Sequence, residues 1–76
     1  MKRTRPYVLV VDDLPDAADS TAQLLALWGH EAVARYSGAA GLAAVALRWP
    51  AVVLLDIGMP QMNGFEFLAR LRELPG

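Results

Sequence analysis

The stretch Val52-Val53-Leu54-Leu55-Asp56-Ile57-Gly58-Met59-Pro60-Gln61-Met62-Asn63-Gly64 decides the fold. An unbroken Val/Leu run leads into one carboxylate, and a loop punctuated by Gly58, Pro60 and Gly64 follows it. Such a run is typical of a strand buried on both faces of a parallel sheet, with helices on either side. Ligands of these sheets bind beyond the carboxyl ends of the strands, so Asp56 is the first candidate for chemistry.

Two further strand–helix units precede this stretch. Residues 7–11 predict a buried strand, and the weakly alternating residues 30–36 predict an edge strand. Three helices are predicted over residues 14–29, 38–48 and 64–74, the second capped by Ser37. The residues expected to face the sheet are Ala18, Thr21, Ala22, Leu25 and Trp28, then Ala39, Leu42, Ala43 and Ala46, and then Phe67, Leu68, Leu71 and Leu74. The chain is therefore expected to be one three-layer α/β domain, residues 1–76, with a parallel sheet of three strand–helix units.

Composition restricts the class of protein. The chain has 76 residues, no cysteine and a net charge of −1, which excludes disulfides and gives no general attraction to nucleic acid or anionic membranes. Lys2, Arg3 and Arg5 lie in a short basic tail, residues 1–6, which is interpreted as solvated rather than as a nucleic-acid arm. There is neither an apolar run of membrane-spanning length nor a signal peptide, so a cytoplasmic protein is expected.

Asp12, Asp13 and Asp56 follow two apolar strands. The carboxyl ends of parallel strands meet at one edge of a sheet, so these carboxylates are expected to lie close together and to bind a cation. Oxygen ligands at an open site suit Mg²⁺, and a carboxylate beside such an ion can accept a phosphoryl group. For Asp12 and Asp13 the alternative, helix capping or simple solvation, stays open.

These residues also carry a resemblance. The acidic pair and the stretch around Asp56 resemble the receiver domain of two-component response regulators, and the segment Leu27-Trp28-Gly29-His30-Glu31 fits its first helix-to-strand turn. The resemblance implies the strand order 2-1-3 and Asp56 as the phosphoacceptor. It also implies Mg²⁺ held by Asp12, Asp13, Asp56 and the backbone carbonyl of Gly58. The expected partner is a sensor histidine kinase or a phosphotransfer protein, and the chain is expected not to be an enzyme.

The chain covers about the first three of the family's five strand–helix units. The family's later Ser or Thr and its Lys have no counterpart, because the only lysine is Lys2. We therefore expect a truncated receiver with impaired phosphotransfer, whose strand 51–57 becomes a free edge that pairs in a homodimer and completes the fold.

Two other functions are alternatives to the phosphoacceptor hypothesis. One is an oligomer that only self-associates and has a vestigial acidic site. The other is a Mg²⁺-dependent phosphohydrolase with Asp56 as nucleophile. Such enzymes commonly carry a second acid two residues later, where this chain has Gly58, so the phosphohydrolase is disfavoured.

Overall fold

The computed structural model describes residues 6–56 and 62–75. Strands and helices alternate along the chain, as the sequence predicts. The elements are β1 (Val8–Val11), α1 (Pro15–Leu27), β2 (Ala32–Arg35), α2 (Gly38–Leu47), β3 (Val52–Leu55) and α3 (Gly64–Arg72).

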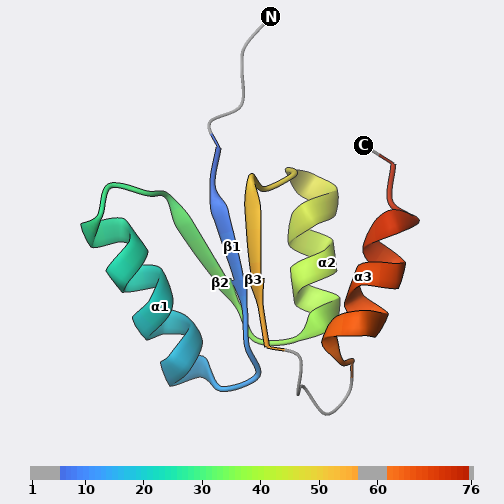
Figure 1. Ribbon diagram of the computed structural model, residues 1–76, viewed down its shortest axis with the longest axis horizontal. Coiled ribbons are helices and arrows are strands. Elements are labelled where there is room, and N and C mark those ends of the chain that lie inside the picture. Colours follow the sequence, from blue (N-terminus) through green and yellow to red (C-terminus); the bar gives the residue numbers. More distant parts are fainter. Residues whose placement is uncertain (1–5, 57–61, 76) are drawn as a thin grey trace, which may run out of the picture.

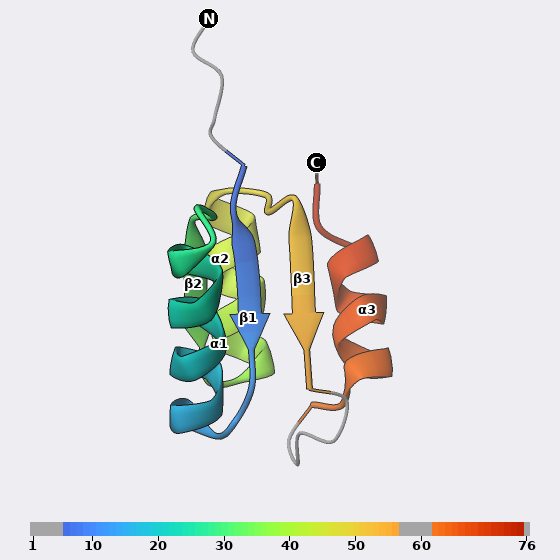
Figure 2. The same ribbon diagram turned by 60° about the vertical axis from the view of Figure 1, so that its left-hand side comes forward.

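The three strands form a parallel sheet in the order β2-β1-β3. Val8 lies opposite Ala32 on one side and Val52 on the other, so β1 is the central strand. Helix α1 covers one face of the sheet, and α2 and α3 lie on the other (Figure 1). Figure 2 shows α3 beyond β3, on the side away from β1. The predicted three-layer α/β architecture and strand order are confirmed.

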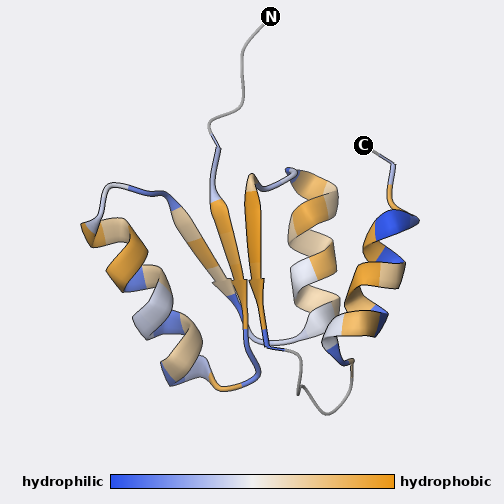
Figure 3. Ribbon diagram, in the orientation of Figure 1, coloured by the Kyte–Doolittle hydropathy of each residue, from blue (hydrophilic) through white to orange (hydrophobic). Residues whose placement is uncertain are grey.

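The core is built around β1. Leu9, Val10 and Val11 are buried, and Val45 from α2 and Phe67 from α3 pack against this strand. Figure 3 shows β1 and β3 as hydrophobic along their length, with hydrophilic residues where the chain leaves their carboxyl ends. Burying this apolar surface is the main driving force for folding. It also brings the polar strand ends together at one edge.

Local sequence sets the helix boundaries. The Ser37 hydroxyl accepts a hydrogen bond from the Ala40 N–H, and the Asn63 side chain accepts one from the Glu66 N–H. Each cap satisfies a backbone donor that a helix start leaves without a partner. Helix α1 ends before Gly29, whose φ of +90° is a left-handed conformation that glycine adopts without a Cβ penalty.

Three expectations about the helix faces are wrong. Trp28 is 67% exposed, because Gly29 turns the chain towards β2 directly after it. In α2 the buried residues are Gly38, Gly41 and Val45, whereas the alanines expected to face the sheet, Ala39, Ala43 and Ala46, are exposed. Leu68 of α3 is exposed as well. Helix α2 consists almost entirely of small apolar residues, so its faces differ little in hydrophobicity. Its sequence therefore does not predict which face packs against the sheet.

Strand β3 is less buried than an unbroken apolar run suggests. Val52 is 48% exposed and Leu54 is 40% exposed, while the equally apolar β1 is almost completely covered. The difference follows from position, because β1 has a neighbour on each side and β3 has one neighbour, β1, among the described strands. The chain thus has a hydrophobic strand at an edge of the described sheet.

Candidate functional site

The ends of β1 and β3 position the acidic residues. The backbone N–H of Asp56 donates to the carbonyl of Val11 at 3.0 Å, and that of Asp12 donates to the carbonyl of Arg35 at 3.1 Å. These bonds extend the two parallel ladders by one residue beyond the strands. Asp12 and Asp56 are therefore held side by side by the backbone of the sheet itself.

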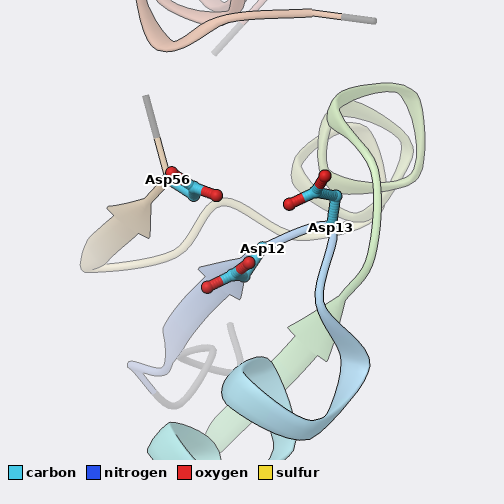
Figure 4. Close-up of side chains that lie close together, drawn as sticks. All are labelled: Asp12, Asp13 and Asp56. Carbon is cyan, nitrogen blue, oxygen red and sulfur yellow. The ribbon is translucent and has the colours of Figure 1, made fainter. Parts of the chain in front are cut away.

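The three predicted carboxylates come together in space. Asp12, Asp13 and Asp56 each offer a carboxylate oxygen, and these atoms all lie within 4.8 Å of one another. All three residues are half-buried. Figure 4 shows the side chains around a common space beyond the ends of β1 and β3. The sequence prediction that these residues form one cluster is thus correct.

Asp12 also has a local structural role. Its Oδ1 accepts a hydrogen bond from the backbone N–H of Leu14 at 3.0 Å, in the residue that precedes α1. A short side-chain bond to the backbone two residues on is a common way for Asp to shape a turn. Helix α1 has no side-chain cap, so the capping alternative is not borne out for Asp12. The turn bond uses one oxygen of Asp12 and is compatible with a cation contact through the other.

The position of Asp13 in the cluster changes the pKa of its carboxyl group. Partial desolvation raises the pKa of the Asp13 carboxyl above its ordinary value, and the negative charge of Asp56, a hydrogen bond with Asp56 and the charge of Asp12 raise it further. Each of these effects disfavours the ionised form of Asp13. Crowded carboxylates with this property favour either a shared proton or a bound cation.

A cavity of about 270 Å³ borders the cluster. Asp12 and Asp56 line it together with the apolar ends of β1 and β3 and with Thr21 of α1. The sequence indicates Thr21 only as a residue on the inward face of its helix. Its position beside two carboxylates is a tertiary consequence of how α1 crosses the sheet, and no local motif around Thr21 signals it.

The donor set suits a hard divalent cation. Carboxylate oxygens are the ligands that Mg²⁺ prefers, and oxygen atoms this close together can contact one ion while leaving positions for water and substrate oxygens. Asp12, Asp13 and Asp56 would hold such an ion. The predicted fourth ligand, the carbonyl of Gly58, lies outside the described residues.

Comparison with known proteins identifies the family. The family model for the response regulator receiver domain matches residues 8–76, which is nearly the whole chain. The chain belongs to the response regulator receiver domain family. The resemblance seen in the sequence is confirmed, and the receiver fold accounts for the parallel sheet with acidic residues at its carboxyl edge.

Individual relatives agree with this assignment. The transcriptional regulatory protein KdpE of Mycobacterium tuberculosis is 38% identical over 65 residues, which cover 86% of this chain and 29% of KdpE. The protein PilH of Pseudomonas aeruginosa is 36% identical over 64 residues, 84% of this chain and 53% of PilH. The chain therefore spans between about a third and a half of the length of these relatives.

Solved structures show the same fold. The chemotaxis protein CheY4 of Vibrio cholerae superposes with a TM-score of 0.85 at 30% identity, over 92% of this chain and 58% of that one. The N-terminal domain of a response regulator receiver protein from Methanoculleus marisnigri gives a TM-score of 0.82 at 35% identity, over 95% and 63%. None of the helices in the described part of this chain has the length and apolar character needed to span a membrane.

Proposed function

We propose that this receiver domain is a phosphoacceptor module of a two-component system and that Asp56 takes up the phosphoryl group. The observation that carries the proposal is the meeting of three carboxylates within 4.8 Å at the carboxyl edge of a receiver sheet. Asp56 is the member that follows the edge strand β3, whereas Asp12 and Asp13 lead into α1. This placement suits Asp56 as acceptor and the acidic pair as the principal cation ligands.

In the proposed reaction a carboxylate oxygen of Asp56 attacks the phosphorus of the donor. The new O–P bond forms as the bond from phosphorus to the donor atom breaks, and the electron pair leaves with the donor. A bound Mg²⁺ would supply charge neutralisation for the carboxylate and the incoming phosphoryl oxygens. The chain's own contribution is to orient Asp56, through its backbone bond to Val11, and to keep Asp12 and Asp13 beside it.

The proposed donor in the cell is the phosphohistidine of a sensor kinase or of a phosphotransfer protein. Membership of the receiver family supports this partner class. The group is taken up once per chain rather than turned over, so we do not class the chain as an enzyme.

Mass spectrometry tests the proposal directly. The 76-residue chain is incubated with Mg²⁺ and a small phosphodonor, in parallel with Asp56→Asn. We expect one phosphoryl adduct on the unsubstituted chain, stable to acid and labile to base, and none on Asp56→Asn. An unsubstituted chain that binds no Mg²⁺ and forms no adduct would contradict the proposal. Continuous release of phosphate would favour the phosphohydrolase instead.

A second candidate function is self-association, either beside phosphoryl uptake or as the only activity. One observation favours it: the apolar strand β3 leaves Val52 and Leu54 exposed at the edge of the described sheet. Phe65 of α3 is also exposed, and it lines an apolar cavity with Val53 and Leu55. An uncharged edge flanked by apolar surface is a template for another strand. We propose a homodimer that uses residues 51–57, either by strand pairing or by exchange of a segment.

A further inference from the structure

Thr21 of α1 lines the cavity beside the acidic cluster. This cavity has a volume of about 270 Å³, and its walls come from β1, β3 and α1. Three of the lining residues have side-chain oxygen atoms: Asp12, Asp56 and Thr21. The other lining residues are apolar: Val10, Val11, Leu54 and Leu55. Among the described residues around this cavity, Thr21 therefore has the one uncharged side chain that forms hydrogen bonds.

The path of α1 across the sheet brings Thr21 to this cavity. The helix begins just after the acidic pair and runs back along one face of the sheet (Figure 1). Ala18 is buried against the sheet, and Thr21 follows it by three residues, so both lie on the same side of the helix. Thr21 is half-buried, whereas its neighbour Ser20 is exposed. The two adjacent hydroxyl groups of α1 are thus in different surroundings.

Within the part of the chain that the structure describes, the Thr21 hydroxyl makes no hydrogen bond. A hydroxyl group both donates and accepts hydrogen bonds, and partial removal from water without a partner costs free energy. The cavity has space for several water molecules of about 30 Å³ each. Its apolar walls strengthen any hydrogen bond formed inside it. The Thr21 hydroxyl is thus suited to bind an oxygen atom located between it and the two carboxylates.

We propose that Thr21 is a binding residue of the acidic cluster and that its hydroxyl forms a hydrogen bond to an oxygen atom of the ligand held there. This oxygen belongs either to a water molecule on the bound cation or to the incoming phosphoryl group. Mg²⁺ usually keeps several of its water molecules, and hydrogen bonds to the groups around a metal ion strengthen its binding. The inference rests on the proposed function, because it takes the cluster as the site of the cation and of phosphoryl uptake.

Two substitutions separate the hydroxyl of Thr21 from the packing of its side chain. Thr21→Val keeps the branched shape and removes the hydroxyl, whereas Thr21→Ser keeps the hydroxyl and removes the methyl group. Mg²⁺ affinity is measured by isothermal titration calorimetry and the rate of phosphoryl uptake by mass spectrometry, both on the full 76-residue chain. Circular dichroism checks that each variant is folded at the temperature used.

Loss of one hydrogen bond changes an affinity or a rate by roughly three- to tenfold. We expect a loss of this size in Thr21→Val and values within about twofold of the unsubstituted chain in Thr21→Ser. A loss of Mg²⁺ affinity in Thr21→Val identifies the oxygen as that of a cation-bound water. Slower uptake at unchanged Mg²⁺ affinity identifies it as a phosphoryl oxygen. Unchanged affinity and uptake in Thr21→Val would overturn the proposal.

Ser20→Ala is the control on the same helix. It removes a hydroxyl group from the adjacent position, but Ser20 is exposed and does not line the cavity. We expect Ser20→Ala to leave Mg²⁺ affinity and phosphoryl uptake unchanged. Equal losses in Ser20→Ala and Thr21→Val would overturn the proposal, as would a loss in Thr21→Ser that matches the loss in Thr21→Val.

The two measurements also keep this inference apart from the proposed function. If the unsubstituted chain binds Mg²⁺ but takes up no phosphoryl group, the proposed function fails, and calorimetry on Thr21→Val still decides whether Thr21 contacts a cation-bound water. If the unsubstituted chain neither binds Mg²⁺ nor takes up a phosphoryl group, both fail.

Discussion

Asp13 and Asp56 offer carboxylate oxygens that lie within 4.8 Å of each other at the carboxyl edge of the sheet. One residue follows β1 and the other follows β3, so the contact exists only because the two strands are parallel neighbours. Desolvation, and then the negative charge of Asp56, raises the pKa of the Asp13 carboxyl. Asp13 therefore binds a proton more readily than an isolated aspartate does, and a cation bound to the cluster would compete with that proton.

Asp13→Asn is predicted to stabilise the metal-free protein at neutral pH. The folded state raises the pKa of Asp13, so it holds this proton more tightly than the unfolded chain does. The stability from this proton is complete below the unfolded pKa and is lost as pH rises through the folded pKa. Asparagine removes the charge that causes this loss. Melting temperatures with a chelator should be higher for Asp13→Asn at neutral pH, and the two proteins should converge as the pH becomes acidic.

Mg²⁺ binding is predicted to weaken at acidic pH for the same reason. Protons compete with the cation for Asp13, and the raised pKa places this competition at a higher pH than for an isolated aspartate. Titration calorimetry at several pH values should show affinity falling as pH decreases, with proton release on binding. Asp13→Asn should lower Mg²⁺ affinity by at least about tenfold. A pH-independent affinity would contradict the assignment of Asp13 as a ligand.

Tyr36 is predicted to titrate later than an ordinary tyrosine. Its hydroxyl donates to Asp19 Oδ1 at 2.6 Å, and this hydrogen bond, followed by desolvation and the Asp19 charge, raises the pKa of Tyr36. The stabilisation it gives is present below the unfolded pKa and lost as pH rises through the folded one. Ultraviolet absorbance should record the late ionisation, and Asp19→Asn should move it towards the usual range. An unchanged titration curve in Asp19→Asn would show that the bond is absent in solution.

Leu9→Ala is predicted to destabilise the whole domain. Leu9 is 0% exposed in the central strand, and removing such a buried side chain costs about 2–5 kcal/mol. The matched control is Leu47→Ala at the end of α2, where the side chain is 89% exposed and the expected change is within about 0.5 kcal/mol. Urea unfolding followed by circular dichroism measures both. Similar losses in the two variants would indicate that β1 is not the centre of the core.

The combined substitution Val52→Lys and Leu54→Lys is predicted to convert a homodimer into a monomer. Both side chains are exposed on β3, and charges on an edge strand oppose pairing with another chain. Leu27→Lys on α1 is the control, because this residue is exposed but far along the chain from β3. Light scattering after gel filtration gives the mass of each protein. A monomeric unsubstituted chain would contradict self-association.

Much of the fold follows from local patterns. The apolar runs of β1 and β3, the Ser37 cap and Gly29 each act over a few residues, and the elements they predict agree with the structure within a few positions. The inward face of α2 could not be predicted in this way. The residues of α2 are nearly all small and apolar, so the helix has no distinct apolar face. The residues that it buries are Gly38, Gly41 and Val45. Met62 packs closely against Gly38, and Val11 and Phe67 pack closely against Gly41.

The sequence by itself determined the class of the protein and the identity of its acidic residues. Carboxylates directly after apolar strands must meet when the strands are parallel, so Asp12, Asp13 and Asp56 could be grouped without coordinates. Only the tertiary structure decided which strand is covered and what surrounds the cluster. β1 and β3 are equally apolar, but burial depends on the number of neighbours, and only β1 has two among the described strands. The placement of Thr21 beside the carboxylates and of Met62 on Gly38 likewise depends on contacts between elements distant in sequence, which no local pattern encodes.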